Sequence, residues 1–354
     1  MGKRRPVRLG QSATGRPGLV DPVRRDPAGL RGPTPKQARG RYWRATSHGL
    51  FVPADVDGSV PEQRIVEAAA VLPSYGGVTG WAALRWMGAR WFGGLAPDGL
   101  TELPIWLATA GDDIRPQPGF QVSAERLNPI ELMVVDGIRV TVPVRSVTFE
   151  MRYAASVRSA VVAADMAMQA DLVSPSELVD FVAGLSGWTG VPRCRAALPL
   201  TSENSWSPRE TSHLRLVWVL DAGLPPPLCN VPIFDRSGRH IGTPDILDEE
   251  AGVAGEYDGA LHLEGSQRAR DVRREEAFRS VGLEYFTVLA SDARDPFDVV
   301  RRMRATRARA RFAAPSDRAW TVDKPPWWIA TETVDQRRAL SDAQRERLLR
   351  HRAG

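Results

Sequence analysis

The feature that most constrains the fold is a run of secondary-structure signals in the C-terminal third of the chain. Two strand-like segments, at residues 241–247 and 253–258, flank the turn-forming residues 248–252, so they predict a β-hairpin. A helix is expected from about residue 267 to 281, and a buried strand at 285–289 follows it. A strand pair followed by a helix and another strand is typical of an α/β domain.

Three carboxylates are expected to converge on this hairpin. Side chains alternate along a strand, so Glu256 and Asp258 point to the same face, roughly 6–7 Å apart. With a turn of about three to five residues, Asp245 falls opposite Gly255 or Glu256 on the paired strand. Carboxylates this close repel each other, and a divalent cation removes the conflict. Oxygen ligands favour Mg²⁺ or Mn²⁺, which can activate water and stabilise charge on a phosphate.

Other polar groups extend this predicted site. His262 follows the second strand closely and could act as an acid or a base. On the next helix, Asp271 and Arg274 share a stripe with Phe278 and Val281. The apolar half of the stripe should pack on the sheet, which would carry the polar half towards the carboxylates. Arg274 is well suited to hold a phosphate there, although Asp271 and Arg274 could also form a simple ion pair on an exposed helix.

A further carboxylate, Glu210, lies near the start of a helix expected at residues 208–222. Ser207 and Glu210 have the spacing of a capping box, in which the two side chains satisfy the first N–H groups of the helix. Glu210 is therefore either a structural cap or a fourth ligand of the metal site. Asp258 has a comparable alternative as the cap of the turn at Gly259.

The order of these residues resembles the domain of unknown function 559, a relative of the very-short-patch repair endonucleases in the PD-(D/E)XK superfamily. The resemblance covers residues 207–289 and rests on these motifs: Pro244-Asp245, Glu256-Tyr257-Asp258-Gly259, His262, Asp271 and Arg274. It implies a restriction-endonuclease-like fold and metal-dependent hydrolysis of phosphodiesters, with Asp245 and Glu256 as metal ligands. Asp258 occupies the position of the superfamily's lysine. Arg274 or His262 would therefore have to supply that role.

The N-terminal part carries no motif of similar specificity. Residues 1–40 are rich in Arg, Gly and Pro, which predicts a flexible basic arm. Residues 41–200 predict a smaller α+β domain with a hairpin at 42–53 and two helices after it. This arrangement is similar to a winged helix and to the N-terminal part of AbiEi-type antitoxins. The arm occupies the place of a recognition helix, which favours a small α+β packing domain instead.

Charge and composition limit the partners. The net charge is +5, and arginine supplies nearly all of the positive charge, which suits a polyanion but also follows from a GC-rich genome. Arg301 and Arg302 in the last long helix could contact a phosphate backbone, or could simply form its solvated face. No apolar run approaches the length of a membrane span, and no apolar secretory segment follows the basic N-terminus. The two cysteines are too few for a disulfide framework, so a reducing cytoplasm is expected.

The sequence therefore predicts a restriction-endonuclease-like α/β domain at residues 205–311, preceded by the smaller α+β domain and followed by an extension at 312–354. The expected function is that of an Mg²⁺- or Mn²⁺-dependent endonuclease acting on nucleic acid, with DNA as the expected substrate. The alternative is a DNA-binding, antitoxin-like transcriptional regulator in which the nuclease fold is inactive.

Overall fold

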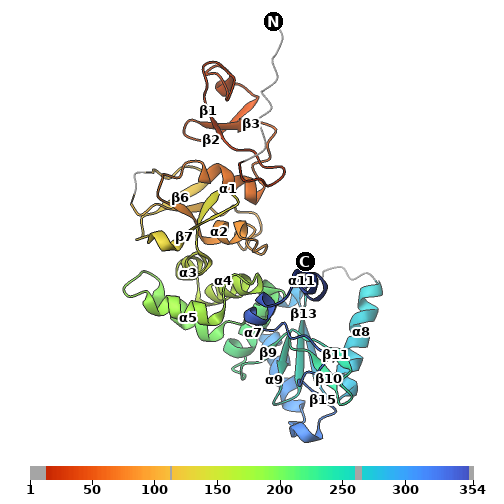
Figure 1. The fold of residues 1–354 in the computed structure, drawn as a ribbon. Helices are drawn as coiled ribbons and strands as arrows, with labels where there is room; N and C mark the ends of the chain where they lie inside the picture. Colours follow the sequence, from red (N-terminus) through yellow and green to blue (C-terminus); the bar gives the residue numbers. More distant parts are fainter. Residues whose placement is uncertain (1–12, 112–113, 260–264, 351–354) are drawn as a thin grey trace. The chain divides into compact units, whose positions relative to one another are not determined.

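A computed structural model describes residues 13–111, 114–259 and 265–350, without the side chains of residues 265–271, 293 and 294. The chain is of mixed α/β type and divides into two compact units, Met1–Tyr153 and Ala154–Gly354 (Figure 1). We refer to them as unit 1 and unit 2 and describe each by itself. The described residues contain no helix that is long and apolar enough to cross a membrane.

Unit 1 contains two sheets and three α-helices among its described residues. Its elements are β1 (Val23–Arg24), β2 (Trp43–Ser47), β3 (Leu50–Pro53), α1 (Pro61–Ala69), β4 (Gly77–Thr79), α2 (Gly80–Trp86), β5 (Ile105–Ala108), β6 (Phe120–Ser123), β7 (Leu132–Val135), β8 (Ile138–Thr141) and α3 (Pro143–Tyr153). The strand orders are β1-β3-β2 and β6-β5-β4-β8-β7. The hairpin and both helices lie where the sequence predicts them. The five-stranded mixed sheet goes beyond a winged helix, because strands far apart in the sequence pair within it.

Residues 13–40 differ from the expected flexible arm, since they pack on the rest of unit 1. The guanidinium of Arg16 lies 3.7 Å from the ring centre of Trp86, and its Nη2 lies 2.7 Å from Asp136 Oδ2. Leu19 is buried, and β1 pairs with β3. Composition alone suggests disorder here, but specific partners on distant elements hold this segment in place. Residues 1–12 lie outside the described part.

Unit 2 begins with helices and continues into the predicted hairpin region. Its elements are α4 (Val157–Gln169), α5 (Pro175–Gly184), α6 (Val191–Ala197), α7 (Pro208–Leu216), the π-helical turn η4 (Val217–Asp221), β9 (Leu228–Cys229), β10 (Ile233–Asp235), β11 (His240–Gly242), β12 (Ile246–Asp248), β13 (Val253–Asp258), α8 (Gly265–Ser280), β14 (Glu284–Leu289), η5 (Ala290–Arg294), α9 (Pro296–Arg309), β15 (Trp320–Thr321), α10 (Val334–Arg338) and α11 (Asp342–Leu348). One sheet has the order β14-β13-β12-β9, and the other has β11-β10-β15.

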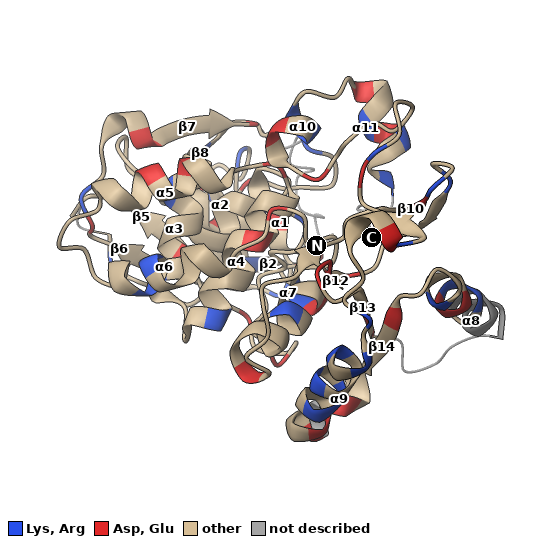
Figure 2. Ribbon diagram, turned by 90° about the horizontal axis from the view of Figure 1, so that it is seen from below, with Lys and Arg blue, Asp and Glu red and all other residues tan. Residues whose placement is uncertain are grey.

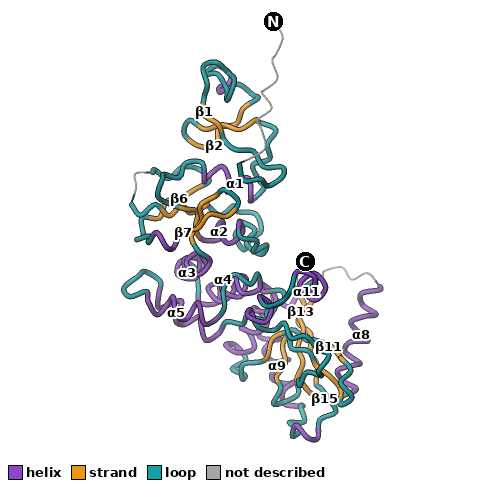
Figure 3. Tube along the Cα trace, viewed as in Figure 1, coloured by secondary structure: helices purple, strands orange, loops and turns teal. Residues whose placement is uncertain are grey.

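The four-stranded sheet of unit 2 is packed on both faces (Figure 3). β12 and β13 are antiparallel, whereas β13 and β14 are parallel and joined through α8, as a crossover connection requires. The core on one face contains Leu214 of α7, Phe286 of β14 and Met303 of α9. Phe278 of α8 and Tyr285 belong to the core on the other face. This layering follows from the alternation of apolar side chains along β13 and β14.

The predicted first arm of the hairpin, residues 241–247, is divided between two sheets. β11 pairs with β10, whereas β12 pairs with β13 and β9. Thr243, Pro244 and Asp245 lie between the two strands, and Pro244 has no N–H group to continue a ladder. This break leaves the backbone carbonyl of Thr243 outside the strand ladders, where it accepts a hydrogen bond from Arg274.

The boundary between the units also differs from the predicted one near residue 200. Helix α4 packs against α7, and its buried Asp165 accepts a hydrogen bond from Ser212 Oγ at 2.5 Å and pairs with Arg215. The residues after 312 are likewise part of unit 2, because β15 pairs with β10 and the buried Arg337 bonds Asp171 at 2.5 Å. A buried ion pair joins positions distant in sequence, so local patterns do not reveal it.

Candidate active site

Asp245 is fixed at the end of the four-stranded sheet by groups from three elements. It immediately precedes Ile246, whose partner is Gly255, so the register places Asp245 beside Glu256 as the hairpin predicts. Its Oδ2 accepts a hydrogen bond from the Tyr257 backbone N–H at 2.9 Å. Its Oδ1 accepts bonds from Thr211 Oγ1 and Asn230 Nδ2, each at 3.2 Å. These three donors orient a carboxylate that keeps further lone pairs for another ligand.

Glu210 of α7 faces the same group of carboxylates. Ser207 makes no side-chain capping bond, so the capping-box interpretation of Glu210 is wrong. A methyl group on Gly259 would lie 2.8 Å from Glu210 Oε1, so the glycine leaves room for this carboxylate next to β13. Burial raises the pKa of Glu210, and the charges of Asp245 and Asp258 raise it further. Glu210, Asp245 and Asp258 therefore form one electrostatic group, which we call the acidic cluster.

Glu256 is engaged differently from the acidic cluster. Its Oε1 lies 2.8 Å from Arg274 Nε, and its Oε2 accepts a hydrogen bond from the Tyr285 hydroxyl at 2.9 Å. Arg274 also donates to the backbone carbonyl of Thr243. Burial and the nearby Glu256 carboxylate raise the pKa of Tyr285, so its hydroxyl stays a donor. The prediction that α8 carries Arg274 to the carboxylates is confirmed. In this structure Arg274 neutralises Glu256, a pairing that the sequence analysis did not foresee.

The remaining predicted site residues have different positions. Asp258 ends β13 and contributes to the raised pKa of Glu210. His262 and the side chain of Asp271 lie outside the described residues. Among the described residues, no three His, Cys, Asp or Glu side chains stand close enough to hold one metal ion as they lie. An ion at the acidic cluster would therefore require these side chains to move closer together.

Arg301 and Arg302 lie on α9, where basic residues predominate (Figure 2). Arg302 donates to the Thr287 carbonyl at 3.0 Å and pairs with Asp292, so it fastens α9 to β14. To bind a phosphate, Arg302 would therefore have to give up its contacts with Thr287 and Asp292. Arg301 is 79% exposed and pairs only with Asp298, one turn away on the same helix, among the contacts that the structure describes. Of the two, Arg301 is the more accessible to a polyanion.

Thr211, Asn230 and Tyr285 were not predicted as site residues. Thr211 follows Glu210 directly, and that adjacency is the one signal the sequence offered for it. Asn230 has a φ of 45°, a left-handed conformation that asparagine tolerates, and its side chain then reaches Asp245. Tyr285 was predicted only as a buried strand residue. Each is a hydrogen-bond donor to a carboxylate, and such roles depend on tertiary contacts.

No protein-family model, curated protein or solved structure matches the chain. The acidic cluster and the Glu256–Arg274 pair are therefore the features of unit 2 that indicate a function.

Proposed function

We propose that unit 2 is a metal-dependent nuclease that hydrolyses phosphodiester bonds of nucleic acid, with DNA as the expected substrate. The observation that carries the proposal is the position of Glu210. The negative charges of Asp245 and Asp258, at the end of β13, act on its carboxyl group and raise its pKa. Among the described residues no cation lies within ion-pair distance of Glu210. Such a group of carboxylates is costly unless a positive charge joins it.

Glu210, Asp245 and Asp258 would hold Mg²⁺ or Mn²⁺, because all three offer hard oxygen donors. The hydrogen bonds from Thr211, Asn230 and the Tyr257 N–H would orient Asp245 for this role, as outer partners orient ligands in metal sites. When bound, the ion would supply Lewis acidity and lower the pKa of water at the reaction centre. This assignment gives Glu210 a larger part than the sequence motif alone suggests.

Arg274 would neutralise the phosphate during hydrolysis. Its side chain is 40% exposed and is held by Glu256 and the Thr243 carbonyl, which fixes the direction of the guanidinium. A guanidinium offers several N–H donors to phosphate oxygens and does not lose its proton near neutral pH. Arg274 can therefore replace the charge of the missing superfamily lysine, but it cannot accept a proton. Glu256 acts in this proposal as a positioning residue for Arg274.

The decisive experiment measures cleavage of single-stranded, duplex, mismatched and branched DNA with Mg²⁺ or Mn²⁺. Asp245→Asn and Glu210→Gln preserve shape but remove charge, and each should lower the cleavage rate by more than about 100-fold, the upper range for loss of a ligand's hydrogen-bond partner. Glu250→Gln is the matched control, because Glu250 lies in the turn at the other end of the hairpin and is 74% exposed. This control should cleave like the wild type.

Two outcomes would overturn the nuclease proposal. Absence of cleavage on every substrate, with DNA binding unchanged in Asp245→Asn, would favour the DNA-binding regulator instead. Cleavage that persists in EDTA and in both cluster variants would show that the activity comes from another site or from a contaminant.

A further inference from the structure

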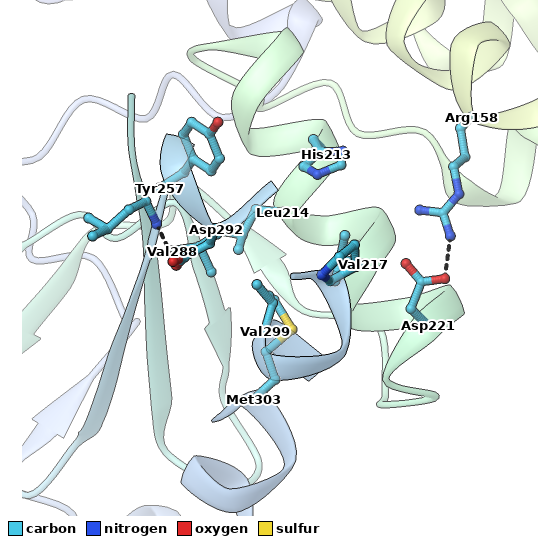
Figure 4. A pocket seen from close by; sticks show the side chains of 12 residues that line it. Arg158, His213, Leu214, Val217, Asp221, Tyr257, Val288, Asp292, Val299 and Met303 are labelled. Atoms are coloured by element: carbon cyan, nitrogen blue, oxygen red, sulfur yellow. Dashed lines mark hydrogen bonds and ion pairs between the residues drawn. The ribbon is translucent and has the colours of Figure 1, made fainter. Parts of the chain in front are cut away.

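Unit 2 contains a pocket of about 370 Å³ (Figure 4). One of its lining residues, Tyr257, immediately precedes Asp258 of the acidic cluster. The pocket lies between α7 with its π-helical turn, the ends of β13 and β14, and α9. Pockets of this volume fall within the range that holds small organic ligands, roughly 300–1,000 Å³. The function proposed above makes no use of this pocket.

The walls of the pocket are mainly aliphatic. Leu214 and Val217 contribute from α7 and its π-helical turn, Val288 from β14, and Val299 and Met303 from α9. All five are buried side chains of the core on this face of the sheet. Aliphatic walls that include a flexible methionine can contact the flat faces of a ring, which carry no hydrogen-bonding groups.

Five polar or charged side chains also line the pocket. Arg158 and Asp221 form an ion pair of 2.6 Å on one side, and Tyr257 and Asp292 lie on the opposite side (Figure 4). Partial burial and the Arg158 charge lower the pKa of His213, so its imidazole is neutral at pH 7 and can both donate and accept. Burial opposes ionisation of Asp292, but the Leu289 N–H and Arg302 outweigh it and lower its pKa. Asp292 is therefore an acceptor for N–H groups.

Tyr257 connects the pocket to the acidic cluster. It lines the pocket, and its backbone N–H donates to Asp245. A nucleotide whose phosphate lies at the cluster would thus have its base within reach of the pocket.

We propose that this pocket receives one nucleobase of the bound strand, next to the phosphate that is cleaved. The inference rests on the proposed nuclease function and names the part of the substrate that the site would select. A nucleobase has the required flat apolar faces and an edge of donors and acceptors, which an aliphatic ligand lacks. Because an ionised carboxylate only accepts hydrogen bonds, Asp292 would contact a donor on the edge of the base, either an amino group or a ring N–H.

The test measures binding of single-stranded oligonucleotides in which one base at a time is removed to leave an abasic site. Binding is measured with Ca²⁺ in place of Mg²⁺, since Ca²⁺ takes the same oxygen ligands and keeps the acidic cluster neutralised. A gel of the recovered strands checks that the oligonucleotide stays intact. For the wild type, loss of the base at one position should weaken binding about tenfold, within the range for one stacked base. Loss at the other positions should have a smaller effect.

Three variants show whether this preference comes from the pocket. His213→Trp places an indole at the mouth and should abolish the effect of the abasic position. His213→Ala leaves the aliphatic walls and should retain most of the effect. Val272→Trp is the control of equal bulk, since Val272 is 49% exposed on α8, and it should behave like the wild type. Thermal unfolding of each variant checks that unit 2 remains folded.

The outcomes separate this inference from the proposed function. Cleavage with no position-dependent effect of base removal would overturn the base pocket and leave the nuclease intact. Equal loss of the effect in His213→Ala and His213→Trp would assign it to the imidazole alone and would also overturn the inference. If the wild type neither binds nor cleaves any oligonucleotide, the proposed function fails and the base pocket fails with it.

Discussion

Glu125 of unit 1 and Glu210 of unit 2 are both partly buried carboxylates, but their neighbours shift their pKa values in opposite directions. In unit 1, Glu125 lies 2.6 Å from Arg152 and 3.2 Å from Arg145, and Tyr153 donates to it at 2.7 Å. Burial opposes its ionisation, yet the bonds from Arg152 and Tyr153 outweigh burial and lower its pKa. In unit 2, burial and neighbouring carboxylates raise the pKa of Glu210.

This difference separates a structural carboxylate from a candidate ligand-binding one. The charge of Glu125 is balanced inside the fold, because both arginines beside it are buried. The charge of Glu210 has no such balance among the described residues, and its neighbours Asp245 and Asp258 add to the repulsion. Several carboxylates that share one place without a cation are a stronger indication of a ligand site than a carboxylate already held in an ion pair.

The largest expected effect is on the stability of unit 1, through the ion pair between Arg152 and Glu125. Arg152→Met should lower the free energy of unfolding of unit 1 by about 3 kcal/mol or more, because it leaves a buried carboxylate short of its main partner. The measurement is denaturant unfolding of the full chain at pH 7. Arg301→Met serves as a control, since an exposed pair contributes about 0–1 kcal/mol. If Arg152→Met and Arg301→Met lowered the free energy of unfolding equally, the buried arginine would not be what stabilises the Glu125 charge.

A divalent cation should stabilise unit 2 and leave unit 1 unchanged. At a Mg²⁺ concentration of roughly 100 times the dissociation constant, the free energy of unfolding of unit 2 should rise by about 2.7 kcal/mol. Thermal unfolding with Mg²⁺ and with EDTA measures this. Asp245→Asn should remove the gain, whereas Glu250→Gln should retain it. A gain that is equally large in Asp245→Asn would place the ion elsewhere.

Glu150 in unit 1 tests how burial alone changes the pKa of a carboxyl group, because no neighbouring carboxylate contributes to its shift. Burial raises the pKa of Glu150 to about 7, although the Trp81 N–H donates to it at 2.8 Å. Its stabilising neutral form is fully present below pH 4.5, the ordinary value, and is lost as the pH rises through 7. Glu150→Gln should therefore stabilise unit 1 at pH 8 by roughly 1–3 kcal/mol and have little effect at pH 4.

Thermal unfolding across this pH range measures the effect of Glu150→Gln. Glu276→Gln, at an exposed position on α8, is the matched control and should leave the pH profile unchanged. A gain that is independent of pH would show that the amide packs better than the acid, and that the Glu150 carboxyl does not titrate near neutral pH.

The smallest expected effect concerns Glu210 itself. Its folded-state pKa is raised, so stability from the neutral carboxyl is present at low pH and is lost as the pH rises. Without metal, Glu210→Gln should stabilise unit 2 at pH 8, by less than about 1 kcal/mol because solvent screens the site. With Mg²⁺ the same substitution should destabilise it. An unchanged sign in Mg²⁺ would exclude Glu210 from the metal ligands.

Much of the hairpin region could be predicted from the sequence. β13 has the predicted bounds, α8 and β14 lie within two residues of theirs, and the register brings Asp245 beside Glu256. Each of these results depends on strand alternation, helical periodicity or the length of one turn, which are local properties. The expected disorder of residues 13–40 and the boundary near residue 200 failed because the contacts involved join distant segments.

The sequence by itself determined which carboxylates are available and which strands and helix present them, because the periods of strand and helix are set by short-range sterics. Only the tertiary structure decided which groups these carboxylates contact. It paired Glu256 with Arg274 and Tyr285, directed Glu210 towards Asp245 instead of Ser207, and enclosed a pocket with side chains from separate helices and strands. Hydrogen bonds and ion pairs act over a few ångströms in space, so residues far apart in the chain become partners only when packing brings them together.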